Sequence, residues 1–161
     1  MRQEFSKVII ELSEADNDVI VLCGDFGHGV FDEYRKCFPK RFYNLGSCEQ
    51  SIIGISAGMA MAGFKPYVFS MTPFLIEKPF EHIKLAIDEQ NVNVKLVGFA
   101  DYPDQNATHR ELNGKGLMGL LKNVVSYFPT SPQETRQALM ESYASPKPAF
   151  ISLKRARPAS H

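Results

Sequence analysis

A single glutamate, Glu49, has a residue type and a position that could support chemistry. It lies in the predicted first turn of a helix, directly after the strand-like run RFYNL and the pair Gly46-Ser47. The positive end of the helix dipole stabilises a carboxylate there, typically by about 0.3–1 kcal/mol. Such a carboxylate could transfer a proton or bind a ligand, and the same position also fits a glutamate that only caps the helix.

Two histidines and three phenylalanines are further candidates. His28 and His109 both lie in loops after predicted strands, where an imidazole could act as a general acid, a general base or a substrate ligand. A lone loop histidine often has no chemical role, so both interpretations stay open. Phe69, Phe74 and Phe80 could form a stacking wall for a planar ring, and core packing is the alternative for two of the three.

The glycine-rich and cysteine patterns predict no phosphate loop and no metal site. The run Gly24–Gly29 follows a strand, but it matches neither G-x-G-x-x-G nor the phosphate loop with its Lys-Ser/Thr, so a tight turn is expected. Cys23, Cys37 and Cys48 are odd in number and form no C-x-x-C pair. We therefore expect free and mostly buried thiols, with neither a disulfide framework nor a zinc knuckle.

Helices and short apolar strands alternate along the chain. Strands are expected at 19–23, 41–45, 66–70, 92–99, 124–127 and 149–153, helices at 2–14, 31–38, 48–62, 74–90 and 131–144, and a long polar loop at 100–116. The alternation predicts an α/β fold, a doubly wound and mostly parallel sheet of about six strands with helices on both faces. Ligands of such sheets bind beyond the carboxyl ends of the strands, which is where Glu49 and both loop histidines are expected.

The composition is typical of one soluble globular domain. The 161 residues are 44% hydrophobic and 22% charged, and 18 Lys+Arg balance 18 Asp+Glu. A balanced charge argues against nucleic acid or a membrane surface as the main partner, because both favour a basic face. No apolar run approaches the roughly 20 residues that span a bilayer. The N-terminal MRQEFSKVII lacks the apolar core of a signal peptide, so a cytoplasmic protein is expected.

A resemblance to the transketolase family begins at Arg41, in the run RFYNLGSCEQSIIGISAGMAMAGFKPYV. In that family a glutamate follows R-F-x-N-x-G and precedes a small-residue helix and a G-x-x-P strand. The resemblance continues through the aromatic segment 69–80 and through Ala-Thr-His-Arg at 107–110, which is similar to the family's Thr-His-Gln. The chain thus resembles the pyrimidine-binding domain of a thiamine diphosphate enzyme, in the branch of transketolase and deoxyxylulose-phosphate synthase. This domain is expected at residues 1–155, with a flexible tail at 156–161.

The resemblance implies roles for five residues. In the family, the carboxyl group at the position of Glu49 hydrogen-bonds a ring nitrogen of the cofactor's aminopyrimidine and favours its imino tautomer. The imino nitrogen then deprotonates the thiazolium carbon. Phe74 and Phe80 match aromatic residues that stack on the pyrimidine, and Asp25 is similar to an aspartate near the cofactor. His109 matches the Thr-His histidine, which faces the substrate and can assist proton transfer.

The resemblance also implies a second chain. Family enzymes hold the diphosphate and Mg²⁺ on another domain, through Gly-Asp-Gly and a downstream asparagine. This sequence lacks that pair, because Gly24-Asp25-Phe26 has the wrong third residue. We therefore expect a split enzyme, an α2β2 assembly with thiamine diphosphate between unlike chains and Mg²⁺ held mainly by the diphosphate-binding subunit. The chain itself is then the pyrimidine-binding subunit.

The implied activity is the transfer of a two-carbon ketol unit, or a related acyl carbanion, between carbonyl compounds such as sugars. Departures from the sugar-phosphate enzymes occur at Ala100 and at 105–107, and Phe128 replaces an arginine before Pro129. A phenyl ring offers a phosphate nothing, so an ordinary pentose phosphate is not expected unless Arg110 or the partner supplies the charge.

Two other functions remain open. The chain could belong to a thiamine diphosphate-dependent 2-oxo acid decarboxylase or acyltransferase, which would release CO₂ rather than exchange carbon from a ketose. It could also be a non-catalytic domain that binds and regulates its partner.

Overall fold

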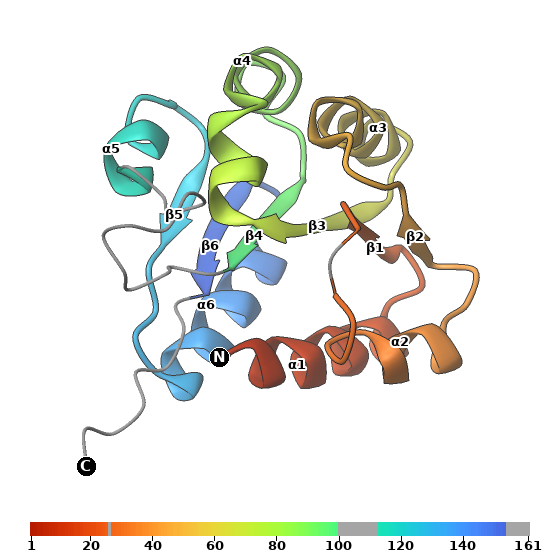
Figure 1. Ribbon diagram of the computed structural model, residues 1–161. Coiled ribbons are helices and arrows are strands. Elements are labelled where there is room, and N and C mark those ends of the chain that lie inside the picture. Colours follow the sequence, from red (N-terminus) through yellow and green to blue (C-terminus); the bar gives the residue numbers. More distant parts are fainter. Residues whose placement is uncertain (26, 100–112, 154–161) are drawn as a thin grey trace.

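The computed structural model describes residues 1–25, 27–99 and 113–153, and these form one parallel sheet between two helical layers (Figure 1). The strands are β1 (Val19–Cys23), β2 (Phe42–Asn44), β3 (Lys65–Met71), β4 (Lys95–Phe99), β5 (Val125–Tyr127) and β6 (Ala149–Leu153), in the order β2-β1-β3-β4-β6-β5. Every neighbouring pair is parallel. The predicted doubly wound α/β class is therefore confirmed, with a sheet that is parallel throughout its described strands.

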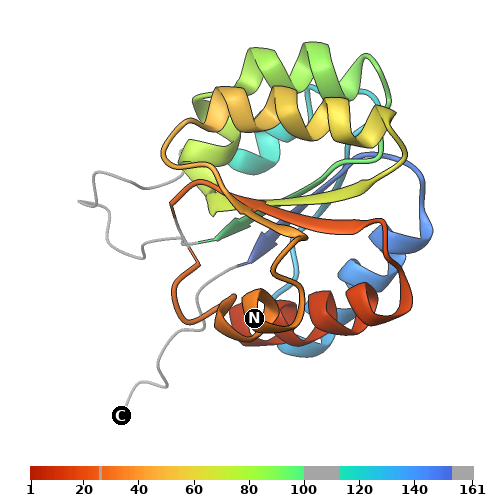
Figure 2. The ribbon, with the colours of Figure 1, turned by 90° about the vertical axis from the view of Figure 1, so that its right-hand side faces the viewer.

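Helices cover both faces of this sheet, as the side view shows (Figure 2). They are α1 (Arg2–Ala15), α2 (Asp32–Cys37), α3 (Glu49–Met61), α4 (Phe80–His82), α5 (Gly114–Met118) and α6 (Pro132–Ala144), with π-helical turns η1 (Pro73–Glu77) and η2 (Ile83–Asp88). One layer holds α1, α2 and α6, and the other holds α3, α4 and α5. No helix in the described ranges is long and apolar enough to cross a membrane.

The two faces of the central strand β1 belong to two separate cores. Val19, Val21 and Cys23 pack in the core beneath α1, α2 and α6, whereas Ile20 and Leu22 pack in the core beneath α3 and its neighbours. All five residues are buried. Burial on both faces explains why this strand is a continuous apolar run rather than an alternating one.

Phe69 is a core residue rather than part of an exposed aromatic wall. Its ring stacks on Phe99 with centroids 4.7 Å apart and on Phe5 with centroids 5.5 Å apart, and it meets the edge of Phe31 at 5.0 Å. Core packing was the open alternative for Phe69, and its zero exposure confirms it.

Three sequence expectations need correction. The helix expected at 74–90 is divided into η1, α4 and η2, and Pro79 is the N-cap of α4, where its missing N–H costs no helical bond. Part of the loop expected at 100–116 is helical, because the Asn113 side chain accepts a hydrogen bond from Gly116 N and starts α5. Only Cys23 among the three free cysteines is buried; Cys37 is exposed and Cys48 is half-buried.

Asp88, the last residue of η2, binds the segment that leads into β5. Its buried carboxylate accepts hydrogen bonds from the backbone N–H groups of Lys122, Asn123 and Val124, at 3.1, 2.6 and 3.1 Å. Asp88→Ala leaves these donors without their charged acceptor, so we expect the free energy of unfolding to fall by about 3 kcal/mol in urea titrations. Glu89→Ala, which removes an exposed carboxylate 3.9 Å from Lys84, is the control and should cost under about 0.5 kcal/mol. Equal costs for the two variants would contradict this role.

Candidate functional site

The sheet has a topological switch point between β1 and β3. After β1 the chain passes through α2 to β2 on one side, and after β3 it passes through η1 to β4 on the other side (Figure 1). In open parallel sheets, ligands bind in the crevice beyond the carboxyl ends of the strands at such a point. The two strands are hydrogen-bonded up to this end, where Gly24 N donates to the Phe69 carbonyl at 3.4 Å.

Glu49 places a buried carboxylate at this switch point. It is the first residue of α3, in the first turn where the sequence predicted it, and only 2% of it is exposed. Its Oε1 atom accepts a hydrogen bond from the Ser70 hydroxyl at 3.5 Å, at the end of β3. A Cβ atom on Gly24, at the end of β1, would lie 3.3 Å from the same oxygen. The carboxylate therefore contacts the ends of both strands that flank the switch point.

The second oxygen of this carboxylate has no hydrogen-bond donor among residues 1–25, 27–99 and 113–153. Glu49 Oε2 is buried, and its nearest charge is the Lys78 ammonium group, with Nζ at 3.5 Å. Burying a carboxylate oxygen without a donor is unfavourable, so such atoms commonly mark places where a ligand completes the hydrogen bonding. The simple capping role does not account for Oε2, because a helix cap needs no buried and unpaired oxygen.

Lys78 contacts both the Phe74 ring and the Glu49 carboxylate, and so links the two. The Lys78 Nζ atom is 4.3 Å from the centroid of the Phe74 ring and also contacts Glu49 Oε2. Both residues belong to the π-helical turn η1 and its C-cap, where Lys78 N donates to the Pro73 carbonyl five residues back, and side chains four apart lie on the same side of a helix. Phe74 is half-buried and packs against the α1 core, so it is anchored while part of it stays accessible.

Asn44 joins the two loops that border the site. Its Oδ1 atom accepts hydrogen bonds from Asp25 N at 3.0 Å and from Gly46 N at 3.1 Å. Asp25 itself is exposed and has a φ of 58°, in the left-handed region that aspartate tolerates better than most residues. The sequence showed Asn44 within R-F-x-N-x-G but offered no reason to assign it this positioning role.

Two further site residues expected from the sequence are Phe80 and His109. Phe80 begins α4 and is half-buried, and it is not among the described partners of the Glu49 carboxylate. His109 lies outside the described residues. Lys78, which contacts Glu49, was not singled out by the sequence, and Ser70 was predicted only to begin an informative loop at 70–74 after a strand. The only signals for them were a hydroxyl at the end of a strand and a lysine within the aromatic segment.

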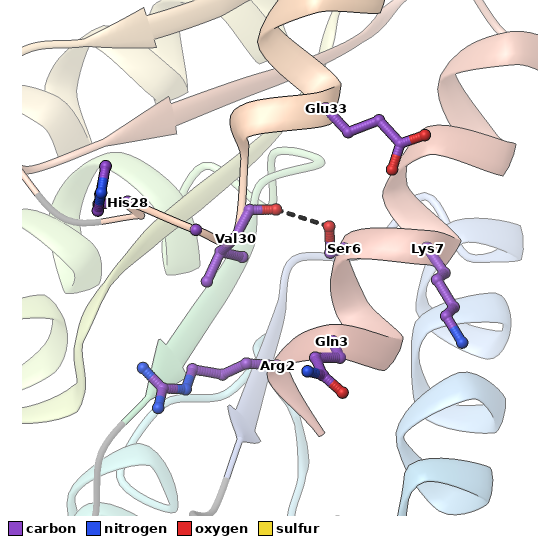
Figure 3. A pocket seen from close by; sticks show the side chains of 8 residues that line it. Arg2, Gln3, Ser6, Lys7, His28, Val30 and Glu33 are labelled. Carbon is purple, nitrogen blue, oxygen red and sulfur yellow. Dashed lines mark hydrogen bonds between the residues drawn. The ribbon is translucent and has the colours of Figure 1, made fainter.

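His28 lines a separate pocket of about 430 Å³ between α1 and the loop after β1 (Figure 3). Its lining residues are Arg2, Gln3, Ser6, Lys7, His28, Gly29, Val30 and Glu33. The Ser6 hydroxyl donates to the Val30 carbonyl at 2.6 Å and joins the two walls. Neither Glu49 nor Phe74 belongs to this pocket, so the structure does not place His28 at the carboxylate.

Comparisons with known proteins agree with this fold. The family model described as "Transketolase, pyrimidine binding domain" matches residues 1–159. The chain is 35% identical over 123 residues to a subunit of apulose-4-phosphate transketolase from Actinobacillus succinogenes, covering 74% of this chain and 40% of that protein. It is 26% identical over 159 residues to the protein of the same name from Phocaeicola vulgatus, covering 96% and 51%.

A solved structure shows the same architecture. It is described as a split-gene transketolase, an inactive β4 tetramer, and it superposes with a TM-score of 0.87 at 27% identity, covering 96% of this chain and 50% of that one. The chain thus spans about half the length of the relatives it matches. Since the family model extends over nearly all of its residues, the chain belongs to the transketolase family, and its fold is that of the family's pyrimidine-binding domain.

Proposed function

We propose that this chain is the pyrimidine-binding subunit of a split, thiamine diphosphate-dependent transketolase-like enzyme. The enzyme transfers a two-carbon ketol unit, or a related acyl carbanion, between carbonyl compounds. The observation that carries the proposal is the buried Glu49 Oε2 atom without a hydrogen-bond donor in the described ranges, next to the half-buried Phe74 ring, at the switch point of the sheet. Family membership favours the same cofactor.

The residues present fit the aminopyrimidine part of this cofactor. Glu49 Oε2 would share a hydrogen bond with a ring nitrogen, and Ser70 would hold Oε1 in place meanwhile. Phe74 would offer its ring to one face of the pyrimidine. When bound, the cofactor supplies a carbon nucleophile at its thiazolium ring. The protein's part is to hold one proton at Glu49, to keep the ring oriented and to exclude water from the carboxylate, which is 2% exposed.

A second subunit would hold the diphosphate and Mg²⁺. The sequence contains no Gly-Asp-Gly. Both apulose-4-phosphate transketolase relatives are named as one subunit of their enzymes, which supports a partner chain. The solved relative is described as an inactive β4 tetramer, so we expect this chain alone to lack activity too. An α2β2 assembly with a diphosphate-binding subunit is the arrangement that we propose.

The outward face of α3 supports a close contact with that subunit. Gly54 and Gly58 are exposed there, and a Cβ atom on either would meet nothing within 4 Å in the described part of the chain. An interior glycine costs a helix about 1 kcal/mol relative to alanine, and nothing within the described chain requires one at either position. Ile55 and Met61 are exposed beside them, at 41% and 61%.

Purification of the tagged chain from its native cells, followed by thiamine diphosphate titration with and without Mg²⁺, tests this function. We expect a co-purifying subunit that contains Gly-Asp-Gly, and Mg²⁺-dependent binding by the pair but not by the chain alone. A ketose donor should then give carbon exchange, whereas CO₂ release from a 2-oxo acid would identify the decarboxylase alternative. A pair that binds no cofactor would overturn the proposal in favour of a regulatory domain.

A further inference from the structure

Lys78 lies where a ring stacked on Phe74 would have to lie. Its ammonium nitrogen is 4.3 Å from the Phe74 centroid and 3.5 Å from Glu49 Oε2. Stacked or tilted aromatic rings have centroids about 4.5–7 Å apart, so a pyrimidine on this face of Phe74 needs the same space. A ring nitrogen bonded to Glu49 Oε2 would also need the side of that oxygen that Lys78 now covers. The ammonium group and the ring therefore exclude one another.

The Lys78 side chain is held loosely enough to exchange. Its side chain is 48% exposed, whereas that of Glu49 is 2% exposed. The lysine end of the ion pair is therefore in contact with solvent, so the ammonium group loses little hydration by making the pair. The four-carbon stem of lysine is flexible, and its charge is satisfied equally well in water. Moving the Lys78 ammonium group into solvent therefore costs little free energy.

The carboxylate, in contrast, depends on a partner. An uncompensated charge in the position of Glu49 would be strongly unfavourable, because it is removed from water and Oε2 has no donor in the described ranges. Lys78 supplies the compensating charge in the free chain. A ligand that offers Glu49 a hydrogen bond can take over this function, so one interaction replaces the other.

We propose that Lys78 is a displaceable cover of the cofactor site: it shields Glu49 while the site is free, and it swings into solvent when the aminopyrimidine stacks on Phe74. This inference rests on the proposed function, because the displacing ring is that of thiamine diphosphate. It goes beyond that function by adding a residue whose contact with Glu49 competes with the cofactor. The cover also keeps a buried carboxylate from remaining unpaired in a subunit that waits for its partner.

The test follows Lys78 directly in the cofactor-free complex of the chain with its partner. Lysine side chains are reductively ¹³C-methylated, and the Lys78 signal is assigned by its loss in Lys78→Arg. In the free complex this signal should be shifted upfield, because it lies over an aromatic ring. Saturating thiamine diphosphate with Mg²⁺ should move it to the position of exposed lysines. Inorganic pyrophosphate with Mg²⁺ has no ring and should leave it unchanged.

Binding and stability give a second readout with opposite signs. In Lys78→Met, thiamine diphosphate should bind about threefold more tightly at low salt, because no ion pair has to break. The same variant should unfold at a lower urea concentration, because its buried carboxylate has lost its counter-charge. Lys84→Met, which removes a half-exposed lysine 3.9 Å from Glu89, is the matched control and should change neither quantity.

The possible results separate this inference from the proposed function. Thiamine diphosphate could bind while the Lys78 signal stays in place and Lys78→Met binds the cofactor no more tightly than wild type does. In that case the proposed role of Lys78 as a cover is wrong, while the proposed function of the chain is unaffected. Weaker binding to Lys78→Met would show that Lys78 helps to hold the cofactor, and would also overturn the cover. If the complex binds no thiamine diphosphate at all, both proposals fall together.

Discussion

Glu49→Gln is expected to lower the turnover number of the assembled enzyme by about 10²- to 10⁴-fold, the range for removing a positioned acid or base. The amide has the size of the carboxyl group, so the packing against Gly24 and Ser70 is kept. What changes is that the side chain can no longer hold and release a proton at Oε2. Steady-state kinetics of the pair with a ketose donor measures the effect, with Glu89→Gln as the control for an exposed glutamate.

The stability of Glu49→Gln should not fall, in contrast to its activity. In wild type, the buried Glu49 carboxylate has lost its hydration and has a half-exposed lysine as its nearest charge. Glutamine removes that buried charge, so the urea midpoint of the variant should equal or exceed that of wild type. A residue kept only for structure would show a loss of stability alongside the loss of activity. Full activity in Glu49→Gln and Glu49→Ala would exclude the role that we assign to this carboxylate.

Gly58→Leu is expected to weaken assembly with the diphosphate-binding subunit strongly while leaving the chain folded. The site lies on the outward face of α3, where a Cβ atom meets nothing in the described structure. A leucine side chain there would hold the partner away from the helix backbone and weaken association at least about tenfold, as overpacking of a close contact does. Size-exclusion chromatography with light scattering, on mixtures of the two subunits, measures the assembly.

The stability of the isolated chain shows whether a change at Gly58 acts on the fold or on the contact with the partner. Gly58→Ala should raise the free energy of unfolding of the isolated chain by about 0.5–1 kcal/mol, because it removes a helix-interior glycine. Gln137→Leu, on an exposed position of α6 in the opposite layer, is the control for adding a surface leucine. If Gly58→Leu assembles as wild type does, the outward face of α3 is not the contact with the partner.

Hydrophobic patterning along the sequence was sufficient for most of the fold. The strand expected at 19–23 agrees with β1, and the helix expected at 131–144 agrees with α6 to within one residue, because their apolar spacing and the proline at the helix start act over a few neighbouring residues. The place of Glu49 in the first turn of α3 was predictable for the same reason. The division of 74–90 into π-helical and α-helical turns could not be predicted, since sequence patterns assume 3.6 residues per turn.

The sequence alone placed a glutamate in the first turn of a small-residue helix after a predicted parallel strand, and it took the resemblance to transketolases to favour a cofactor site there over a helix cap. Only the tertiary structure decided what surrounds the carboxylate. Gly24, Ser70 and Lys78 come from segments far from Glu49 in the chain, and they meet it because β1 and β3 lie side by side with the switch point between them. Strand order depends on how both cores are buried at once, and no local pattern of residues encodes it.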